Sequence, residues 1–182
     1  MSNTHFKLFA FPFSIVAATQ PNLIGEAKGA APVKHKIAYM SPPGKYLQRV
    51  AVDIGDVPGH QLAVYDIQYK FESDAPVYDG VKVAEMLVRG ASDVIDGSGS
   101  STLYAVNRLE NGDMIFSQNN MVLKATVNPD GSTQAQFNTV GKITGGTGKF
   151  KGIRGVTHSV GTTDFKTGVN LQQNEVEYWF EN

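Results

Sequence analysis

Seven segments that alternate between apolar and polar residues follow one another after residue 60, with turn-forming residues between them. Such alternation is typical of strands with one buried face, and Asn-Gly or Asp-Gly pairs between alternating runs indicate hairpins. The expected strands span residues 61–71, 81–88, 101–108, 114–127, 133–143, 153–161 and 174–180. Since no helical spacing is sustained, seven or eight strands at this regular spacing predict an all-β fold, an antiparallel barrel or sandwich.

The length, composition and net charge of the chain limit the fold size and the partners to be expected. The 182 residues suit one domain, and with 41% hydrophobic residues, 18% charged residues and a net charge of −1 the chain has no basic surplus. We therefore expect neither nucleic acid nor membrane as a partner. The absence of Cys excludes disulfides and thiolate chemistry. Pro and Gly are frequent in residues 20–60, so we expect an N-terminal arm and loops over 1–60 and a β-domain over 61–182.

An apolar run follows Lys7 and covers residues 8–18. It has the shape of a short signal peptide but is too short to span a membrane. We interpret it as an extended arm or strand packed on the body of a cytoplasmic protein. Export through a cleaved signal is the alternative.

The segment 145–155 contains five glycines in eleven residues and looks at first like a phosphate-binding loop. It fails that test, because Ile143 stands where the P-loop needs its first glycine and Phe150 stands where the P-loop needs a hydroxyl. Lys151 replaces the third glycine of the dinucleotide fingerprint, and no amphipathic helix follows. We interpret the segment as a tight turn between strands.

Three segments carry a family likeness. Residues 64–68 (Val-Tyr-Asp-Ile-Gln), with Pro-Val-Tyr at 76–78, resemble the first strand and following loop of allene oxide cyclases. Residues 143–152 are similar to the Ile-Thr-Gly-Gly-Ser-Gly segment of those enzymes and equally to the Gly-Gly-Thr-Gly-Lys-Phe signature of plant dirigent proteins. Residues 175–180 are similar to the last strand of both. The likeness covers about residues 61–181.

The resemblance implies an all-β, eight-stranded antiparallel β-barrel with an apolar cavity, here with an extended N-terminal arm, in an assembly that is usually trimeric. It also implies that Asp66 and Gln68 point into the cavity, on the mixed face of the first strand. The aromatic face of that strand, with Tyr65, Ile67 and Tyr69, is then left to meet another subunit.

The resemblance assigns catalytic roles to Asp66 and Gln68. The family's Glu at the position of Asp66 stabilises positive charge in the opened epoxide, and its Asn at the position of Gln68 holds a water with a Ser-Pro pair. Here Asp66 is one methylene shorter, Gln68 is one longer, and Asp74 with Pro76 replaces the pair. From the residues alone, a carboxylate in an apolar strand is either a general acid with a raised pKa or a structural partner of an Arg.

Further residues are candidates for the cavity wall. The expected substrate-binding residues are Val64, Pro76, Glu85, Arg89, Tyr104, Asn107, Gln118 and Asn120. Glu85 and Arg89 are read alternatively as a surface ion pair. His158 stands alone on a late strand and the other histidines are scattered, so we expect no metal and no cofactor.

Two functions follow from these expectations. The first is a cofactor-independent isomerase or cyclase that acts on a hydrophobic small molecule in the barrel cavity. The alternative is a non-catalytic, dirigent-like binding protein that steers a reactive intermediate, and a purely structural barrel is the third reading. The expected partners are a hydrophobic small-molecule ligand and further copies of the chain in a trimer or dimer.

Overall fold

The computed structural model describes residues 31–181, and those from Pro32 onward belong to one compact unit. The expectations for residues 1–30, including the apolar run and its alternative as a signal peptide, lie outside the described residues. The ten strands are β1 (His35–Met40), β2 (Gly44–Asp53), β3 (His60–Lys70), β4 (Val77–Tyr78), β5 (Val81–Ile95), β6 (Ser98–Leu109), β7 (Met114–Val127), β8 (Thr133–Gly146), β9 (Ile153–Asp164) and β10 (Val169–Phe180). A single 3₁₀ turn, η1 (Gly148–Phe150), lies between β8 and β9.

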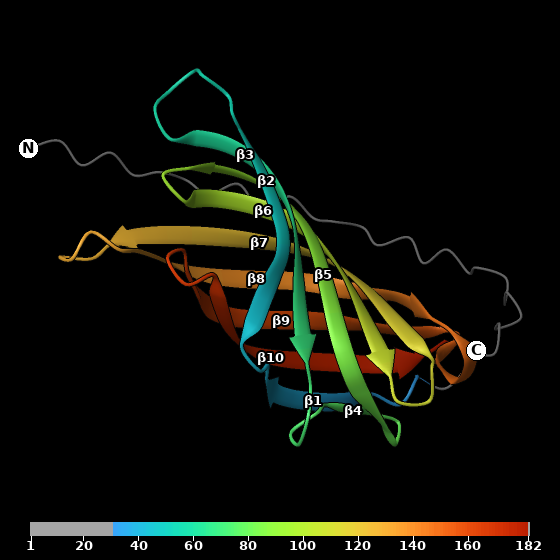
Figure 1. The fold of residues 1–182 in the computed structure, drawn as a ribbon. Coiled ribbons are helices and arrows are strands. Elements are labelled where there is room, and N and C mark those ends of the chain that lie inside the picture. Colours follow the sequence, from blue (N-terminus) through green and yellow to red (C-terminus); the bar gives the residue numbers. More distant parts are fainter. Residues whose placement is uncertain (1–30, 182) are drawn as a thin grey trace, which may run out of the picture. The chain divides into compact units, whose positions relative to one another are not determined.

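The strands form an antiparallel sheet whose hydrogen bonding runs in a ring (Figure 1). The order is β2-β3-β5-β6-β7-β8-β9-β10, and β10 returns to β2 through the pairs Val169–Lys45 and Asn170–Gly44. Along the rest of the same edge β10 pairs with β1, from Gln173 to Tyr178. The all-β antiparallel expectation is confirmed, and the ring divides the side chains into an inner and an outer set.

Residues 35–53 differ from the expected arm and loops, because β1 and β2 are strands of the same sheet. The two prolines at 42–43 lie between β1 and β2, the glycine after them begins β2, and the Pro-Gly pair at 58–59 lies in the loop before β3. An irregularity hides β2 from pattern analysis: Tyr46 pairs with Ile67 and Gln48 with Asp66, so Leu47 is an extra residue. This β-bulge breaks the period-two alternation by which the other strands are recognised.

The inner side chains pack most densely at one end of the ring. Tyr78, Phe150, Ile115, Ile153 and Val83 are almost completely buried there. Aromatic contacts join them to the last strand, with ring centroids 5.3 Å apart for Tyr78 and Tyr178 and 6.4 Å apart for Phe150 and Phe180. We call this group the closed end.

The glycine-rich segment builds the closed end. As expected, it is a turn between strands, and η1 within it delivers Phe150 to the interior. Gly148 has φ of +49°, and a Cβ at this position would lie 1.9 Å from Oδ1 of Asp113, so both the backbone and the space require glycine. The backbone N–H of Lys149 donates to Oδ2 of Asp113 at 3.1 Å. The segment is therefore a structural plug.

Candidate functional site

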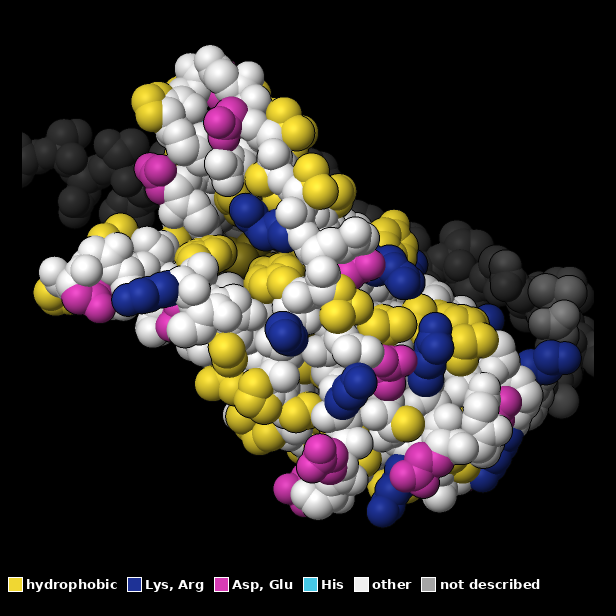
Figure 2. All heavy atoms as spheres, viewed as in Figure 1, with side chains coloured by type: hydrophobic (Ala, Val, Ile, Leu, Met, Phe, Trp, Pro, Cys, Tyr) yellow, Lys and Arg dark blue, Asp and Glu magenta, His cyan; other side chains and the backbone are white. Residues whose placement is uncertain are grey.

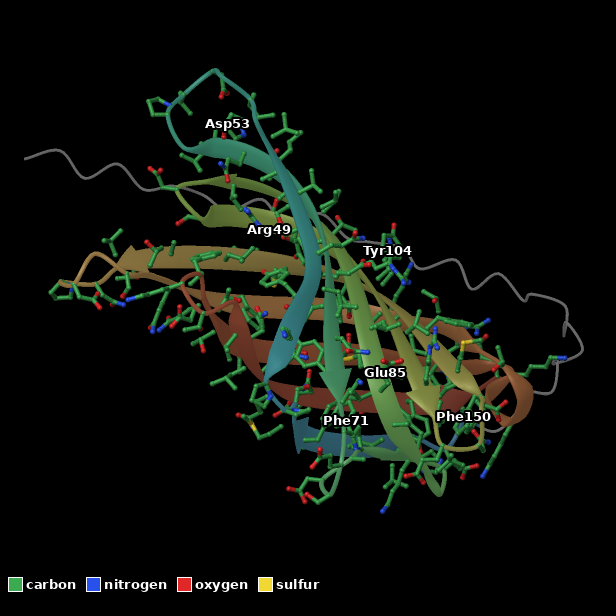
Figure 3. All side chains as sticks on the ribbon, in the orientation of Figure 1. Arg49, Asp53, Phe71, Glu85, Tyr104 and Phe150 are labelled. Carbon is green, nitrogen blue, oxygen red and sulfur yellow. The ribbon has the colours of Figure 1, made fainter. Side chains whose placement is uncertain are left out.

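Away from the closed end, the interior of the ring holds a cavity of about 510 Å³. Its rim includes Gly97 of the β5–β6 turn, Thr133 at the start of β8 and Phe165 of the β9–β10 turn. Figure 2 shows a hollow lined with hydrophobic side chains and a positively charged side chain at its edge, at the position that Figure 3 labels Arg49. A concave, mostly apolar space of this size is the usual form of a small-molecule site.

One wall of the cavity is apolar and aromatic. The inward residues of β3, β5, β6 and β7 form it, and they are Tyr65, Ile67, Tyr69, Met86, Val88, Leu103, Ala105 and Met121. Phe137 of β8 joins the same cluster. Each comes from the apolar face of an alternating strand, so hydrophobic burial directs it inward.

Glycines under the large side chains keep the centre of the cavity open. A Cβ at Gly90 would lie 2.4 Å from the ring of Tyr65, and one at Gly161 would lie 2.4 Å from the ring of Phe137. Because these rings lie against the backbone of a neighbouring strand, they line the wall instead of filling the space between walls. A side chain at either glycine would push the ring inward.

The rest of the lining, which begins at Ser117 and Asn119 of β7 and continues on β8, β9 and β10, carries neutral polar groups joined to each other, and we call it the polar wall. Oγ1 of Thr157 donates to Oδ1 of Asn119 at 2.6 Å, and Nδ2 of Asn119 donates to Oγ of Ser117 at 3.0 Å. A second chain runs from β9 across β10 to the loop after β1: Oγ of Ser159 donates to Oδ1 of Asn174 at 2.7 Å, and Nδ2 of Asn174 donates to Oγ of Ser41 at 3.0 Å. These paired groups hold fixed positions along the wall.

Asn107 is different from these paired amides. It lines the cavity from β6 and is only 7% exposed, yet its Oδ1 has no hydrogen-bond partner among the described residues. A buried amide oxygen without a partner destabilises the fold by roughly 1–3 kcal/mol. Asn107 therefore brings an unsatisfied acceptor into the cavity wall, which is unusual for a buried polar group.

Ionisable groups in the lining are mainly tyrosines. Burial raises the pKa of Tyr39, Tyr65, Tyr69 and Tyr78, and it raises the pKa of Tyr46 to about 12. These phenols are therefore protonated at neutral pH and act as hydrogen-bond donors. Among the described residues, the charged side chains of the lining are Arg49 and Asp96, which lies in the β5–β6 turn.

Asp66 and Gln68 lie on the outer face of the ring. Asp66 forms an ion pair with Nε of Arg89 at 3.3 Å and accepts a hydrogen bond from Nε2 of Gln48 at 3.1 Å. Gln68 donates to Glu85, which pairs with Arg108. The expected inward placement is wrong. Alternation along β3 allows only one of its faces to lie inside, and burying the aromatic face stabilises the fold more than burying the face with Asp66 and Gln68 would.

The same finding corrects the aromatic face of β3. Tyr65, Ile67 and Tyr69 were expected to meet another subunit, but they are buried inside the ring. The structural alternative for Asp66, a partner for an Arg, matches its contact with Arg89. Glu85 and Arg89 lie on the outer face, as that alternative expects, but they do not pair with each other: Glu85 pairs with Arg108 and Arg89 pairs with Asp66.

Of the ten expected site residues, Asn107 is the one that lines the cavity. Val64 and Tyr104 are more than half exposed on the outer face, and Nε2 of Gln118 donates to the hydroxyl of Tyr104 at 3.4 Å. Asn120 is exposed on the outer face of β7, and Pro76 is buried in the loop before β4, outside the cavity. The inward placement expected for these residues is wrong, because each has the strand parity of the outer face or lies in a loop.

Most residues of the polar wall were not predicted from the sequence, although the strand pattern contains an indication of them. Ser117 and Asn119 interrupt an inward row of β7 that continues with Met121, and Thr139 follows Phe137 in the same way on β8. A polar residue within the apolar face of a strand indicates a cavity wall or a buried hydrogen bond. Arg49 carried no such signal, because the β-bulge changes its parity.

In the part of the chain that the structure describes, no three His, Asp or Glu side chains gather as a metal site, and no helix is long and apolar enough to cross a membrane. The cavity therefore offers apolar contact, neutral hydrogen bonds and two rim charges. No protein-family model, curated protein or solved structure matches this chain.

Proposed function

We propose that the strand ring is an eight-stranded β-barrel of the allene oxide cyclase and dirigent type. We propose further that it binds a hydrophobic small molecule in its cavity and steers a reactive form of it, as a dirigent-like protein does. The ring-like hydrogen bonding and the glycine-rich turn support the first part. The cavity supports the second.

The observation that carries the proposal is the neutrality of the cavity interior. Within the described residues its polar wall consists of amides and hydroxyls, and Asp96 is the one carboxylate in the lining. A general acid or base must lie within hydrogen-bond reach of the reacting group and have a pKa near the working pH. Fixed neutral groups orient a ligand without exchanging protons, so binding and steering fit the geometry better than proton transfer.

The second candidate is the cofactor-independent isomerase or cyclase. The inward phenols favour it, because Tyr65 and Tyr69 are protonated donors beside the space that a ligand would fill. In this version a tyrosine hydroxyl, and not Asp66, stabilises developing charge on the substrate. The two candidates differ in whether the protein alone changes its ligand.

Binding is tested with phenylnaphthylamine, a neutral apolar dye that fluoresces when it leaves water. We expect saturable binding to the protein and its loss in Ala105→Trp, because Ala105 lies on the apolar wall and an indole there fills the space. Thermal unfolding of the variant verifies that it folds, and Ser117→Phe fills the cavity from the neighbouring strand, where Ser117 pairs with Ala105. Equal dye binding by all folded forms would contradict the proposal.

Steering is tested with a phenolic substrate and a one-electron oxidant. The dirigent-like proposal predicts no change of the phenol without oxidant and an altered ratio of coupled stereoisomers with it. Turnover by the protein alone would support the isomerase instead. Stereoisomers in the ratio of the protein-free reaction, together with no turnover, would contradict both.

The expected homo-oligomer is also a proposal. Its support is the outer face of β2 and β3, where Val50, Val52, Leu62 and Val64 are exposed side by side. Contiguous exposed apolar residues favour contact with another surface. Light scattering on the purified protein should give a dimer or trimer mass, and Val64→Lys should lower it. A monomer at all concentrations would contradict this part.

A further inference from the structure

Arg49 reaches the cavity because of the β-bulge in β2. Two residues of regular strand separate side chains on one face, but Tyr46 and Arg49 are three apart and both line the cavity. The extra residue, Leu47, accounts for the difference. Bulges re-aim side chains near the ends of barrels and beside functional sites. Here the result is a guanidinium at the rim of an otherwise neutral cavity.

Arg49 differs from the other arginines in its contacts. The sequence contains four, and three of them form ion pairs: Arg89 with Asp66, Arg108 with Glu85 and Arg154 with Glu181. Among residues 31–181 no carboxylate lies within ion-pair distance of Arg49, although Asp96 also lines the cavity. The guanidinium therefore keeps its donors for another partner.

Arg49 lies beside two tyrosines of the wall, because it pairs with Tyr65 across β2 and β3 and lines the cavity together with Tyr46 and Tyr65. Burial raises the pKa of Tyr46, Tyr65 adds to the rise, and the positive charge of Arg49 opposes it. Arg49 also opposes the rise that burial causes in the pKa of Tyr65. The rings of Tyr46 and Tyr65 touch edge to face, with centroids 5.7 Å apart. A guanidinium next to these rings faces the same space as they do.

The apolar wall and the polar wall indicate which chemical groups the rest of the ligand carries. A plain alkyl chain would make no hydrogen bond with the amides and hydroxyls of the polar wall, whereas a fully polar molecule would not cover the aromatic wall. A ring system with oxygen-bearing groups along one edge satisfies both. We propose that the cavity takes an amphipathic anion of this kind, whose acidic group binds Arg49 at the rim while its ring body fills the cavity. This inference rests on the proposed binding function.

Two dyes with the same ring system separate the charge from the ring body. Anilinonaphthalene sulfonate carries an acidic group, and phenylnaphthylamine lacks it. We expect Arg49→Gln to weaken sulfonate binding about fivefold, the scale of one charge-assisted contact at a partly solvated site, and to leave phenylnaphthylamine binding unchanged. Arg108→Gln is the matched control, because it removes an arginine on the outer face, and it should change neither affinity.

Added salt gives a second measurement that needs no variant. Screening should weaken the sulfonate dye and leave the neutral dye unaffected in the unaltered protein. Equal effects of Arg49→Gln on both dyes, or none on either, would overturn the anion site while the binding function stands. If the neutral dye does not bind, or binds equally to the unaltered protein and to Ala105→Trp, the proposed binding function is overturned, and the anion inference with it.

Discussion

The two ends of the strand ring are built from the same alternating strands but serve different purposes. At the closed end the glycine-rich turn packs Phe150, which has no exposed surface, against β7, β8 and the ring of Phe180 (Figure 3). At the open end Phe165 follows β9 and is 40% exposed beside the rim of the cavity. The closed end is densely packed and stabilises the fold, whereas the open end is less densely packed and leaves space for a ligand.

The largest expected effect comes from removing one phenylalanine at each end. Phe150→Ala should lower the free energy of unfolding by about 3–5 kcal/mol, because it leaves a cavity in a fully packed region. Phe165→Ala should lower it by less than about 1 kcal/mol. Urea unfolding followed by circular dichroism measures both values. Equal losses would show that the two ends do not differ in packing.

The next effect concerns the amides of the polar wall. Asn107→Leu removes the unpaired buried oxygen and should raise the free energy of unfolding by about 1 kcal/mol. Asn119→Leu removes an amide that is bonded to Ser117 and Thr157, so it should lower the free energy by about 1–3 kcal/mol. Thermal unfolding compares the pair. A stability loss for Asn107→Leu as large as that for Asn119→Leu would mean that Asn107 is already satisfied.

A smaller effect is expected at Asp66. Its ion pair with Arg89 is partly exposed, so Asp66→Ala should lower stability by less than about 1 kcal/mol and leave dye binding in the cavity unchanged. Titration of phenylnaphthylamine and urea unfolding measure the two quantities. A loss of dye binding in a stably folded Asp66→Ala protein would show that Asp66 contributes to the ligand site.

The smallest effect is a pH dependence at the loop between β2 and β3. The ring of His60 forms hydrogen bonds with Oδ1 of Asp93 at 2.8 Å and with Oδ1 of Asp56 at 2.6 Å. Both carboxylates raise the pKa of His60, and the bond to Asp93 has the larger effect. Since the folded pKa lies above the unfolded one, this stabilisation is complete below about pH 6.5 and is lost as the pH rises through the folded value. The stability difference between the protein and His60→Asn should shrink over that rise. A difference that grows with pH would contradict the assignment.

The sequence predicts the strands well where alternation is regular. The segments expected at 114–127 and 133–143 correspond to β7 and β8, because side-chain burial there follows the period of two without interruption. β2 escaped prediction because Leu47 shifts its alternation and prolines flank it. A bulge depends on the partner strand, so a local pattern cannot locate it.

The site was harder to predict than the strands. Placing Asp66 inside required overriding the apolar face of its own strand, and the elementary rule that aromatic faces are buried was the better guide. Asn107 was predicted together with Tyr104 from residue type alone, and it lies inside because it shares parity with Leu103 and Ala105. Arg49 was not found, because the bulge and the closing of the ring together bring it to the cavity.

The central claim is that a ligand binds inside the ring and not on its outer face. The methionines allow a direct test by methyl NMR: Met86 and Met121 line the cavity, whereas Met40 lies in a more open depression on the outer face. Addition of phenylnaphthylamine should shift the methyl signals of Met86 and Met121 and leave that of Met40 in place. A shift at Met40 with none at Met86 and Met121 would contradict the account.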